Sequence, residues 1–173
     1  MEDTRNLIDK YKGLDNEVII ADLDKSRSPL ELAIENLAHD FNIGTIIRNA
    51  NAWNVSKVHI IGKKKYNRRG AMVTDRYLHI LHHPTPADFL STQQGRILIA
   101  IENNVCQAKP LSAAKFPLQT TLIFGSESDG ISVELLKSAH HTYFIEQLGS
   151  TRSINVGCAS AIAIYEYFRR HNK

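Results

Sequence analysis

Short apolar runs bounded by polar residues recur along the chain and are typical of buried β-strands. The pattern predicts strands at residues 17–23, 57–62, 76–83, 96–102, 121–125 and 142–147. Residues 29–37 fit two structures: Leu30, Leu32 and Ile34 alternate as in a strand, whereas the Ala and Glu residues between them suit a helix.

Helical spacing of apolar residues predicts helices at 44–54, 86–92, 132–141 and 153–170. Ser132 is placed to cap one of them, and Ser153 opens the last. Strands that alternate with helices, and that read as continuous apolar runs, predict an α/β fold with a mostly parallel sheet flanked by helices. We expect one domain over residues 17–173, preceded by an extension at 1–16. Ligands of such sheets bind at the carboxyl ends of the strands.

Composition narrows the class of protein. The chain has 173 residues, of which 43% are hydrophobic, enough for one well-buried core. It contains no apolar run long enough to cross a membrane, and its polar N-terminus does not have the pattern of a signal peptide. Two cysteines, Cys106 and Cys158, are too few for a disulfide scaffold. We therefore expect a cytoplasmic protein with no membrane partner.

Positive charge is concentrated in one segment, KKKYNRR at residues 63–69. The net charge of the chain is only +3, so the remainder is acidic overall. Such a cluster attracts phosphates, and it is equally consistent with a solvated loop that contacts nothing. The candidate RNA-binding residues are Lys63, Lys64, Lys65, Arg68 and Arg69.

A polar turn, GSESDG at residues 125–130, follows an apolar strand. It is not a phosphate-binding P-loop, a nucleophile elbow or a dinucleotide-binding glycine motif, because none of those spacings is matched. Taken alone, it is equally well read as an acidic strand-to-helix turn.

Two further stretches carry polar residues at helix starts. Asn42, Gly44 and Arg48 form Asn-x-Gly-x-x-x-Arg, which we expect to place an arginine on the otherwise apolar face of a helix. Burying it requires a partner, and a salt bridge to Glu127 or Asp129 is the structural alternative. Ser153 and Asn155 precede a helix rich in small residues, where they serve either as caps or as site residues.

The order and spacing of these three stretches resemble the three motifs of the SpoU (TrmH-like) RNA 2′-O-ribose methyltransferases of the SPOUT superfamily. Motif one is matched by Asn42, Gly44 and Arg48, and motif two by Gly125, Glu127 and Gly130. Motif three is matched by residues 145–149 and 153–156, with Glu146 and Gln147 in place of the usual Pro-Met. The resemblance spans about residues 30–170.

The resemblance implies a SPOUT fold with a C-terminal deep trefoil knot, and methyl transfer from S-adenosylmethionine to a ribose 2′-hydroxyl of tRNA or rRNA. It implies catalytic roles for Asn42, Arg48, Glu127, Ser153 and Asn155. The cofactor-binding residues that it implies are Ile101, Gly125, Ile145, Gln147, Gly149 and Ile154. It also implies a homodimer and requires no metal. Two alternatives remain: a catalytically silent RNA-binding protein of the same fold, and a nucleotide-binding oxidoreductase, which the glycine pattern disfavours.

Overall fold

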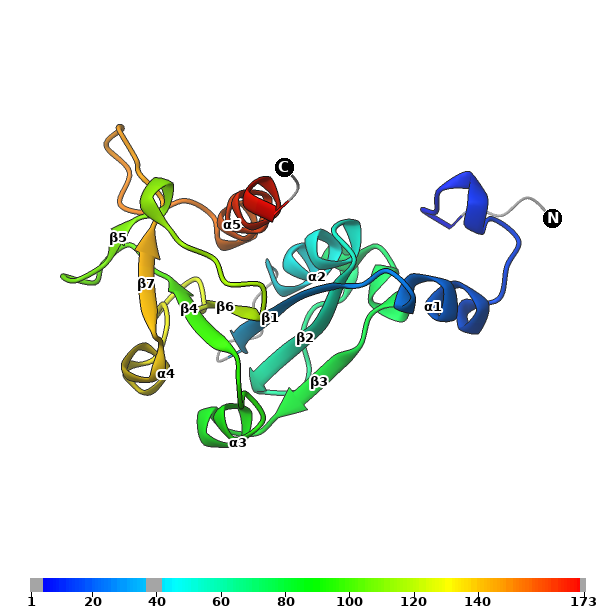
Figure 1. Ribbon diagram of the computed structural model, residues 1–173, viewed down its shortest axis with the longest axis horizontal. Coiled ribbons are helices and arrows are strands. Elements are labelled where there is room, and N and C mark those ends of the chain that lie inside the picture. The colour runs from blue at the N-terminus through cyan, green and yellow to red at the C-terminus, as the bar shows by residue number, and fades with distance from the viewer. Residues whose placement is uncertain (1–4, 37–41, 172–173) are drawn as a thin grey trace.

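A single seven-stranded sheet, in the order β3-β2-β1-β6-β4-β7-β5, forms the centre of the molecule (Figure 1). The structure is a computed structural model, and it describes residues 5–36 and 42–171. Every pairing between the strands is parallel, as the continuous apolar runs predict. The strands are β1 (Ser28–Asn36), β2 (Val55–Gly62), β3 (Ile80–His83), β4 (Ile97–Ile101), β5 (Lys109–Pro110), β6 (Thr120–Phe124) and β7 (His141–Phe144).

Helices cover both faces of the sheet (Figure 1). Their bounds are α1 (Asn16–Asp24), α2 (Asn42–Ala52), α3 (Pro86–Ser91), α4 (Val133–Ser138) and α5 (Val156–His171). Four short 3₁₀ turns join them: η1 (Asp9–Tyr11), η2 (Arg69–Ala71), η3 (Thr74–Tyr77) and η4 (Leu111–Ala113). Helices α2 and α5 pack on one face, and α3 and α4 pack on the other.

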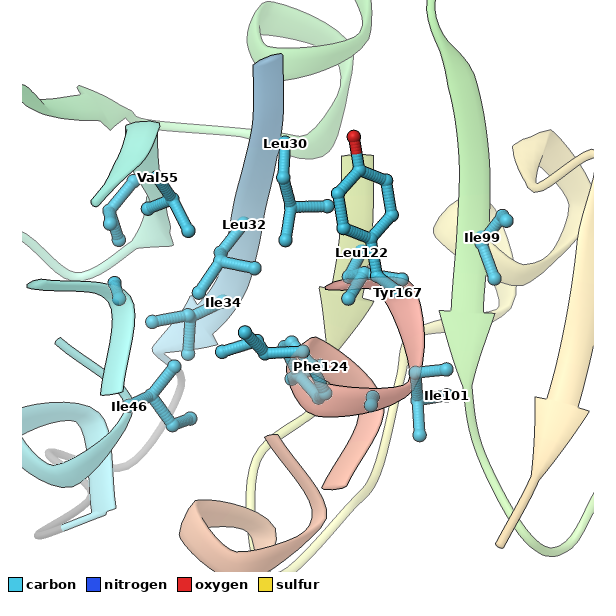
Figure 2. Close-up of a cluster of buried hydrophobic side chains, with 14 of the residues drawn as sticks. Leu30, Leu32, Ile34, Ile46, Val55, Ile99, Ile101, Leu122, Phe124 and Tyr167 are labelled. Carbon is cyan, nitrogen blue, oxygen red and sulfur yellow. The ribbon is translucent and has the colours of Figure 1, made fainter. Parts of the chain in front are cut away.

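Strand β1 shows how the sequence divides between the two faces, because successive strand side chains point in opposite directions. Leu30, Leu32 and Ile34 enter the larger core, where they meet α2 and α5; Figure 2 shows them beside Phe124 and Tyr167. The intervening positions face α3 and α4. The alternation of residues 29–37 is thus that of a strand, and the helical reading of this segment is wrong.

The packing of α2 against α5 includes an aromatic cluster around Trp53. The Trp53 ring stacks on Phe168 with centroids 4.9 Å apart, and it meets the edge of Tyr165 at 6.0 Å. Offset and edge-to-face pairs of this kind add to the stabilisation from buried area. They attach the C-terminal helix to the helix that carries motif one.

On the opposite face, polar residues occupy buried positions beneath α3. His59 of β2 lies between Glu31 of β1 and His83 of β3, with nitrogen–oxygen and nitrogen–nitrogen distances of 2.9 and 2.8 Å. The ring of Phe89 on α3 contacts both histidines edge-on. None of these residues belongs to the three motifs.

Two strand predictions were wrong. Residues 17–23 form most of helix α1, which buries Ile19 and leaves Val18 about half exposed at 52%. Seven apolar and acidic residues do not distinguish a short strand from an amphipathic helix, and here the helix wins because α1 packs on η3 rather than joining the sheet. Of the segment 76–83, only Ile80–His83 is strand, because η3 occupies its start.

The remaining predicted elements are confirmed, with shifts at their ends. The Ser132 hydroxyl accepts a hydrogen bond from the Leu135 amide, which caps α4 as predicted. The last helix begins at Val156 rather than at Ser153. Within the described ranges, none of the helices is long and apolar enough to span a membrane. The division into an extension and a domain stays a prediction, and residues 1–4 lie outside the described part.

Candidate functional site

The three motifs meet through one hydrogen-bonded chain of side chains. The Asn42 amide nitrogen donates to the Glu127 carboxylate at 2.7 Å. The Asn155 amide nitrogen donates to the Asn42 side-chain oxygen at 2.8 Å. These residues are 85 and 113 positions apart in the sequence, so only the fold brings them together.

Asn155 is oriented by the helix that it precedes. Its side-chain oxygen accepts hydrogen bonds from the backbone amides of Gly157 at 2.9 Å and Cys158 at 3.3 Å. An Asn in this position satisfies amides that the first turn of a helix leaves unpaired. The cap fixes which end of the amide faces the helix, and the nitrogen is thereby directed toward Asn42. The structure thus joins the two readings of Asn155, since it both caps α5 and belongs to the polar chain.

Arg48 lies on the exposed side of α2, one turn beyond Gly44. The expectation that it sits on the apolar face is wrong, because Ile43, Ile46 and Ile47 form the buried face without it. The alternative of a salt bridge to Glu127 or Asp129 is not realised, since the guanidinium has no ion pair or hydrogen bond among residues 5–36 and 42–171. A solvent-facing arginine of this kind is available to a ligand.

Glycine is required at position 44 by a close backbone contact. A β-carbon at Gly44 would lie 2.8 Å from the Ala71 amide nitrogen and 2.9 Å from the Asn67 carbonyl oxygen. The start of α2 is therefore pressed against the segment that follows the basic cluster. Motif one thus sets how closely α2 packs against residues 67–71.

The glycine loop, Gly125–Gly130, closes on itself. Ser126 and Gly130 exchange two backbone hydrogen bonds, at 3.1 and 3.0 Å. A β-carbon at Gly125 would lie 2.0 Å from the Gly130 carbonyl carbon, and Gly130 has a positive φ of 70°. Both conditions exclude larger residues. The loop exposes Glu127 at its tip, where it meets Asn42.

Three of the predicted cofactor residues, Ile101, Gly125 and Ile145, lie at the carboxyl ends of β4, β6 and β7. The others, Gln147, Gly149 and Ile154, lie in the segment between β7 and α5. Gly125 and Ile101 are buried, Ile145, Gln147 and Ile154 are partly buried, and Gly149 is exposed. The Gln147 amide nitrogen is buried and has no hydrogen-bond partner within the described chain. An unsatisfied buried donor is rare in native proteins and indicates a position where a ligand acceptor belongs.

Glu146, which departs from the family motif, turns toward η4. Its carboxylate accepts a hydrogen bond from the Ser112 hydroxyl. This bond holds the pKa of Glu146 below its usual value. The residue therefore attaches the motif-three segment to its neighbour. Ser153 is exposed, and the structure does not bring it into the chain formed by Asn42, Glu127 and Asn155.

The basic cluster projects into solvent from the segment after β2. Lys63, Lys64, Lys65, Arg68 and Arg69 are all exposed. The buried Asn36 amide donates to the carbonyl of Lys65 at 2.9 Å, which fixes the backbone beneath them. The Arg68 guanidinium pairs with the buried Asp75 carboxylate. Its charge is partly committed to the fold.

Comparison with known proteins decides the family. The model of the SpoU rRNA Methylase family matches residues 29–165, most of the chain. The chain belongs to the SpoU rRNA methylase family. This membership confirms the resemblance read from the three motifs.

Two relatives show the extent of the similarity. The Escherichia coli tRNA (guanosine(18)-2′-O)-methyltransferase is 25% identical over 152 residues, which cover 86% of this chain and 66% of that enzyme. The Thermus thermophilus enzyme of the same name is 24% identical over 160 residues, covering 89% of this chain and 82% of the relative. The chain thus spans slightly less than two thirds of the E. coli enzyme.

Solved structures confirm the fold class. The A. aeolicus TrmH/SpoU tRNA modifying enzyme superposes with a TM-score of 0.78 at 23% identity, covering 91% of this chain and 82% of that one. The AdoMet-bound rRNA methyltransferase from Sinorhizobium meliloti gives a TM-score of 0.74 at 24% identity, covering 86% and 60%. The parallel sheet flanked by helices is therefore the SPOUT methyltransferase fold.

Proposed function

We propose that the chain is an RNA 2′-O-ribose methyltransferase that uses S-adenosylmethionine and acts on tRNA or rRNA. The observation that carries the proposal is the hydrogen-bonded chain Glu127–Asn42–Asn155, in which residues of all three motifs meet, together with the exposed Arg48 on the same helix as Asn42. Each of the three motifs supplies a member of this arrangement. The family membership and the named activities of the relatives support the same reaction.

The residues at the strand ends fit S-adenosylmethionine. Gly125 lets the backbone come close to a ligand, Ile101, Ile145 and Ile154 offer apolar contact, and the Gln147 nitrogen supplies an unused donor. Gly149 completes the set on the exposed segment that follows. When bound, the cofactor supplies an electrophilic methyl group on a sulfonium. We also infer the trefoil knot that the family implies for this region.

Methyl transfer requires that the ribose 2′-hydroxyl lose its proton as the new oxygen–carbon bond forms. Arg48 is the group placed to contact this hydroxyl or its neighbouring phosphate. An arginine is protonated at neutral pH, so it suits phosphate binding and orientation better than proton removal. In this proposal Arg48 orients the hydroxyl and its neighbouring phosphate, and the phosphate helps to take up the proton. Asn42 and Glu127 hold each other by a hydrogen bond, and Ser153 supplies a further exposed hydroxyl.

We further propose that RNA contacts the basic cluster and that two chains associate. Lys63, Lys64, Lys65 and Arg69 offer charge for phosphates, with Arg68 contributing less because of Asp75. On α5, Ile162 and Tyr165 are exposed by 41% and 55%, and they border a depression of about 260 Å³ next to Ile145. A second copy packed there would cover this apolar surface. We place the protein in the cytoplasm with its RNA substrates.

The test is methyl transfer from radiolabelled S-adenosylmethionine to unmodified tRNA and rRNA, followed by digestion and mapping of the labelled nucleotide. We expect a 2′-O-methylated nucleoside with the natural sequence, and its loss in Arg48→Ala. Arg76→Ala is the matched control, because Arg76 is exposed and lies outside the motifs. RNA binding with neither methyl transfer nor cofactor binding would favour the silent RNA-binding alternative.

A further inference from the structure

The glycine loop is closed internally, but its two Ser126–Gly130 hydrogen bonds do not fix its position relative to the sheet. That position determines where Glu127 stands, and Glu127 reaches Asn42 across 2.7 Å. The loop leaves β6 at Phe124 and returns to the fold at Ile131, which is buried. The contacts made by Ile131 and its neighbours therefore decide how precisely the loop is held.

One contact comes from Glu102, directly after β4. Its Oε2 accepts a hydrogen bond from the Ile131 amide at 3.1 Å, and its Oε1 accepts one from the Asn103 amide at 2.9 Å. Both carboxylate oxygens are thus engaged with backbone donors. A β-carbon at Gly130 would lie 2.6 Å from Oε2, so glycine at this position also makes room for the carboxylate.

A second contact comes from Glu35 near the end of β1. Its Oε2 accepts a hydrogen bond from the Ser132 amide at 2.6 Å, and its side chain is almost completely buried. In the sheet, β1 and β4 lie on either side of β6. Two carboxylates from the two flanking strands therefore hold consecutive amides, Ile131 and Ser132, just where the glycine loop ends.

We propose that Glu102 and Glu35 are positioning residues that hold the glycine loop in the conformation that binds S-adenosylmethionine. This inference rests on the proposed function, since it assigns the loop to the cofactor. Hydrogen bonds from an amide to an ionised carboxylate are stronger than those between neutral groups. They are suited to holding a loop that must otherwise rely on glycines, which are the most flexible residues of the chain.

The two carboxylates differ in how well a glutamine can replace them. In Glu102→Gln, an NH₂ group replaces one of the two oxygens. This donor would then face a backbone amide, which is also a donor, where the carboxylate offered an acceptor. Either Ile131 or Asn103 then loses its partner. In Glu35→Gln, a single oxygen still serves Ser132. We therefore expect the larger effect at Glu102. Glu134→Gln is the matched control, because Glu134 is exposed on the first turn of α4 and its substitution removes the same charge.

The first measurement is the Kd for S-adenosylmethionine, by calorimetry, together with the KM values for cofactor and RNA. We expect Glu102→Gln to raise the Kd and the cofactor KM roughly 10-fold, as for one lost charged hydrogen bond. The RNA KM should not change, Glu35→Gln should have a smaller effect, and Glu134→Gln none. A merely structural role would lower the melting temperature and leave the cofactor KM as it is, and that result would overturn the proposal.

The second measurement separates this inference from the proposed function. Amide hydrogen exchange of Ile131 in the cofactor-free protein needs neither cofactor nor activity. Faster exchange in Glu102→Gln than in Glu134→Gln supports the hold on the loop, and equal exchange overturns it. Failure of the natural sequence to bind S-adenosylmethionine would instead refute the proposed function, and the exchange rates would still decide whether the carboxylates hold the loop.

Discussion

Two polar networks, one formed by the motif residues Glu127, Asn42 and Asn155 and one beneath α3, differ in their exposure to water. The chain Glu127–Asn42–Asn155 is built from exposed or half-exposed side chains, and Arg48, on the same helix as Asn42, is exposed as well. The row Glu31–His59–His83 is buried, with exposed fractions of 4%, 1% and 7%. Each has a middle residue that bonds to both neighbours, Asn42 in one and His59 in the other.

The buried row of Glu31, His59 and His83 is completed by a neighbouring arginine. Arg96 lies 3.3 Å from Glu31 and also donates to the backbone carbonyls of Pro29 and Thr120. Burial alone would raise the pKa of Glu31, but the hydrogen bond from His59 and the positive charge of Arg96 outweigh it and lower the pKa. A network whose members satisfy one another stabilises the fold, whereas one that leaves a cation unpaired at the surface is ready for a ligand.

We expect the largest effect from replacing Asn42, the middle residue of the exposed network. Asn42→Ala deletes the hydrogen bonds that join Asn42 to Glu127 and to Asn155. We expect methyl transfer to fall roughly 100- to 1,000-fold, as when an oriented active-site donor is lost. The free energy of unfolding should change by less than about 1 kcal/mol, because the bonds are exposed. Single-turnover rates and urea unfolding test this, with the exposed Asn6→Ala as control.

Removing the middle residue of the buried network should do the opposite. His59→Ala removes the hydrogen-bond partner of His83 and one of the partners of Glu31, and it opens a cavity against Phe89. We expect a loss of about 3 kcal/mol in the free energy of unfolding, because two buried hydrogen bonds are lost and a cavity is created. Methyl transfer per folded molecule should be unchanged. His141→Ala, at an exposed histidine, should be nearly neutral; equal losses in both variants would show that the buried row contributes nothing special.

The smallest of the three effects is expected from acid, which should lower the stability that the buried network gives to the fold. Burial, together with the neighbouring His59 and His82, holds the pKa of His83 below the usual 6.5. The unfolded chain then binds its proton first, so stability is complete above about pH 6.5 and declines as the pH falls below it. The lowered pKa of Glu31 adds a further loss below about pH 4.5.

Urea unfolding at a series of pH values measures this decline. His83→Gln should remove the part that begins near pH 6.5, whereas His141→Gln should leave it in place. If His83→Gln retained the full decline, another group would be responsible.

The sequence identified the exposed network because its residues follow a family pattern. Asn42, Glu127 and Asn155 are far apart in the chain, and no periodicity relates them. They were identified only because each matches one of the three family motifs. The fold class followed from apolar runs, which burial dictates directly. Residues 17–23 were misassigned because a single apolar run does not reveal whether it will find a strand partner or a helix surface.

The buried row and the two loop-holding carboxylates were missed for a different reason. Glu102 and Glu35 bond to backbone amides, which every residue carries, so no partner type signals them. His59 and Glu31 did leave a trace, as polar residues inside the apolar runs VHII and LELAI. A charged or titratable residue in a central strand must have a buried partner, and that rule would have pointed to the row without naming its members.

Trp53 is the chain's one tryptophan, and it lies where α2 meets Phe168 and Tyr165 of α5. Its fluorescence therefore reports on one place, the contact between α2 and the C-terminal helix. Detachment of α5 would expose the indole to water and shift its emission to longer wavelength. The molecule thus carries its own optical probe, with no label needed, for following in real time when its C-terminal helix docks during folding.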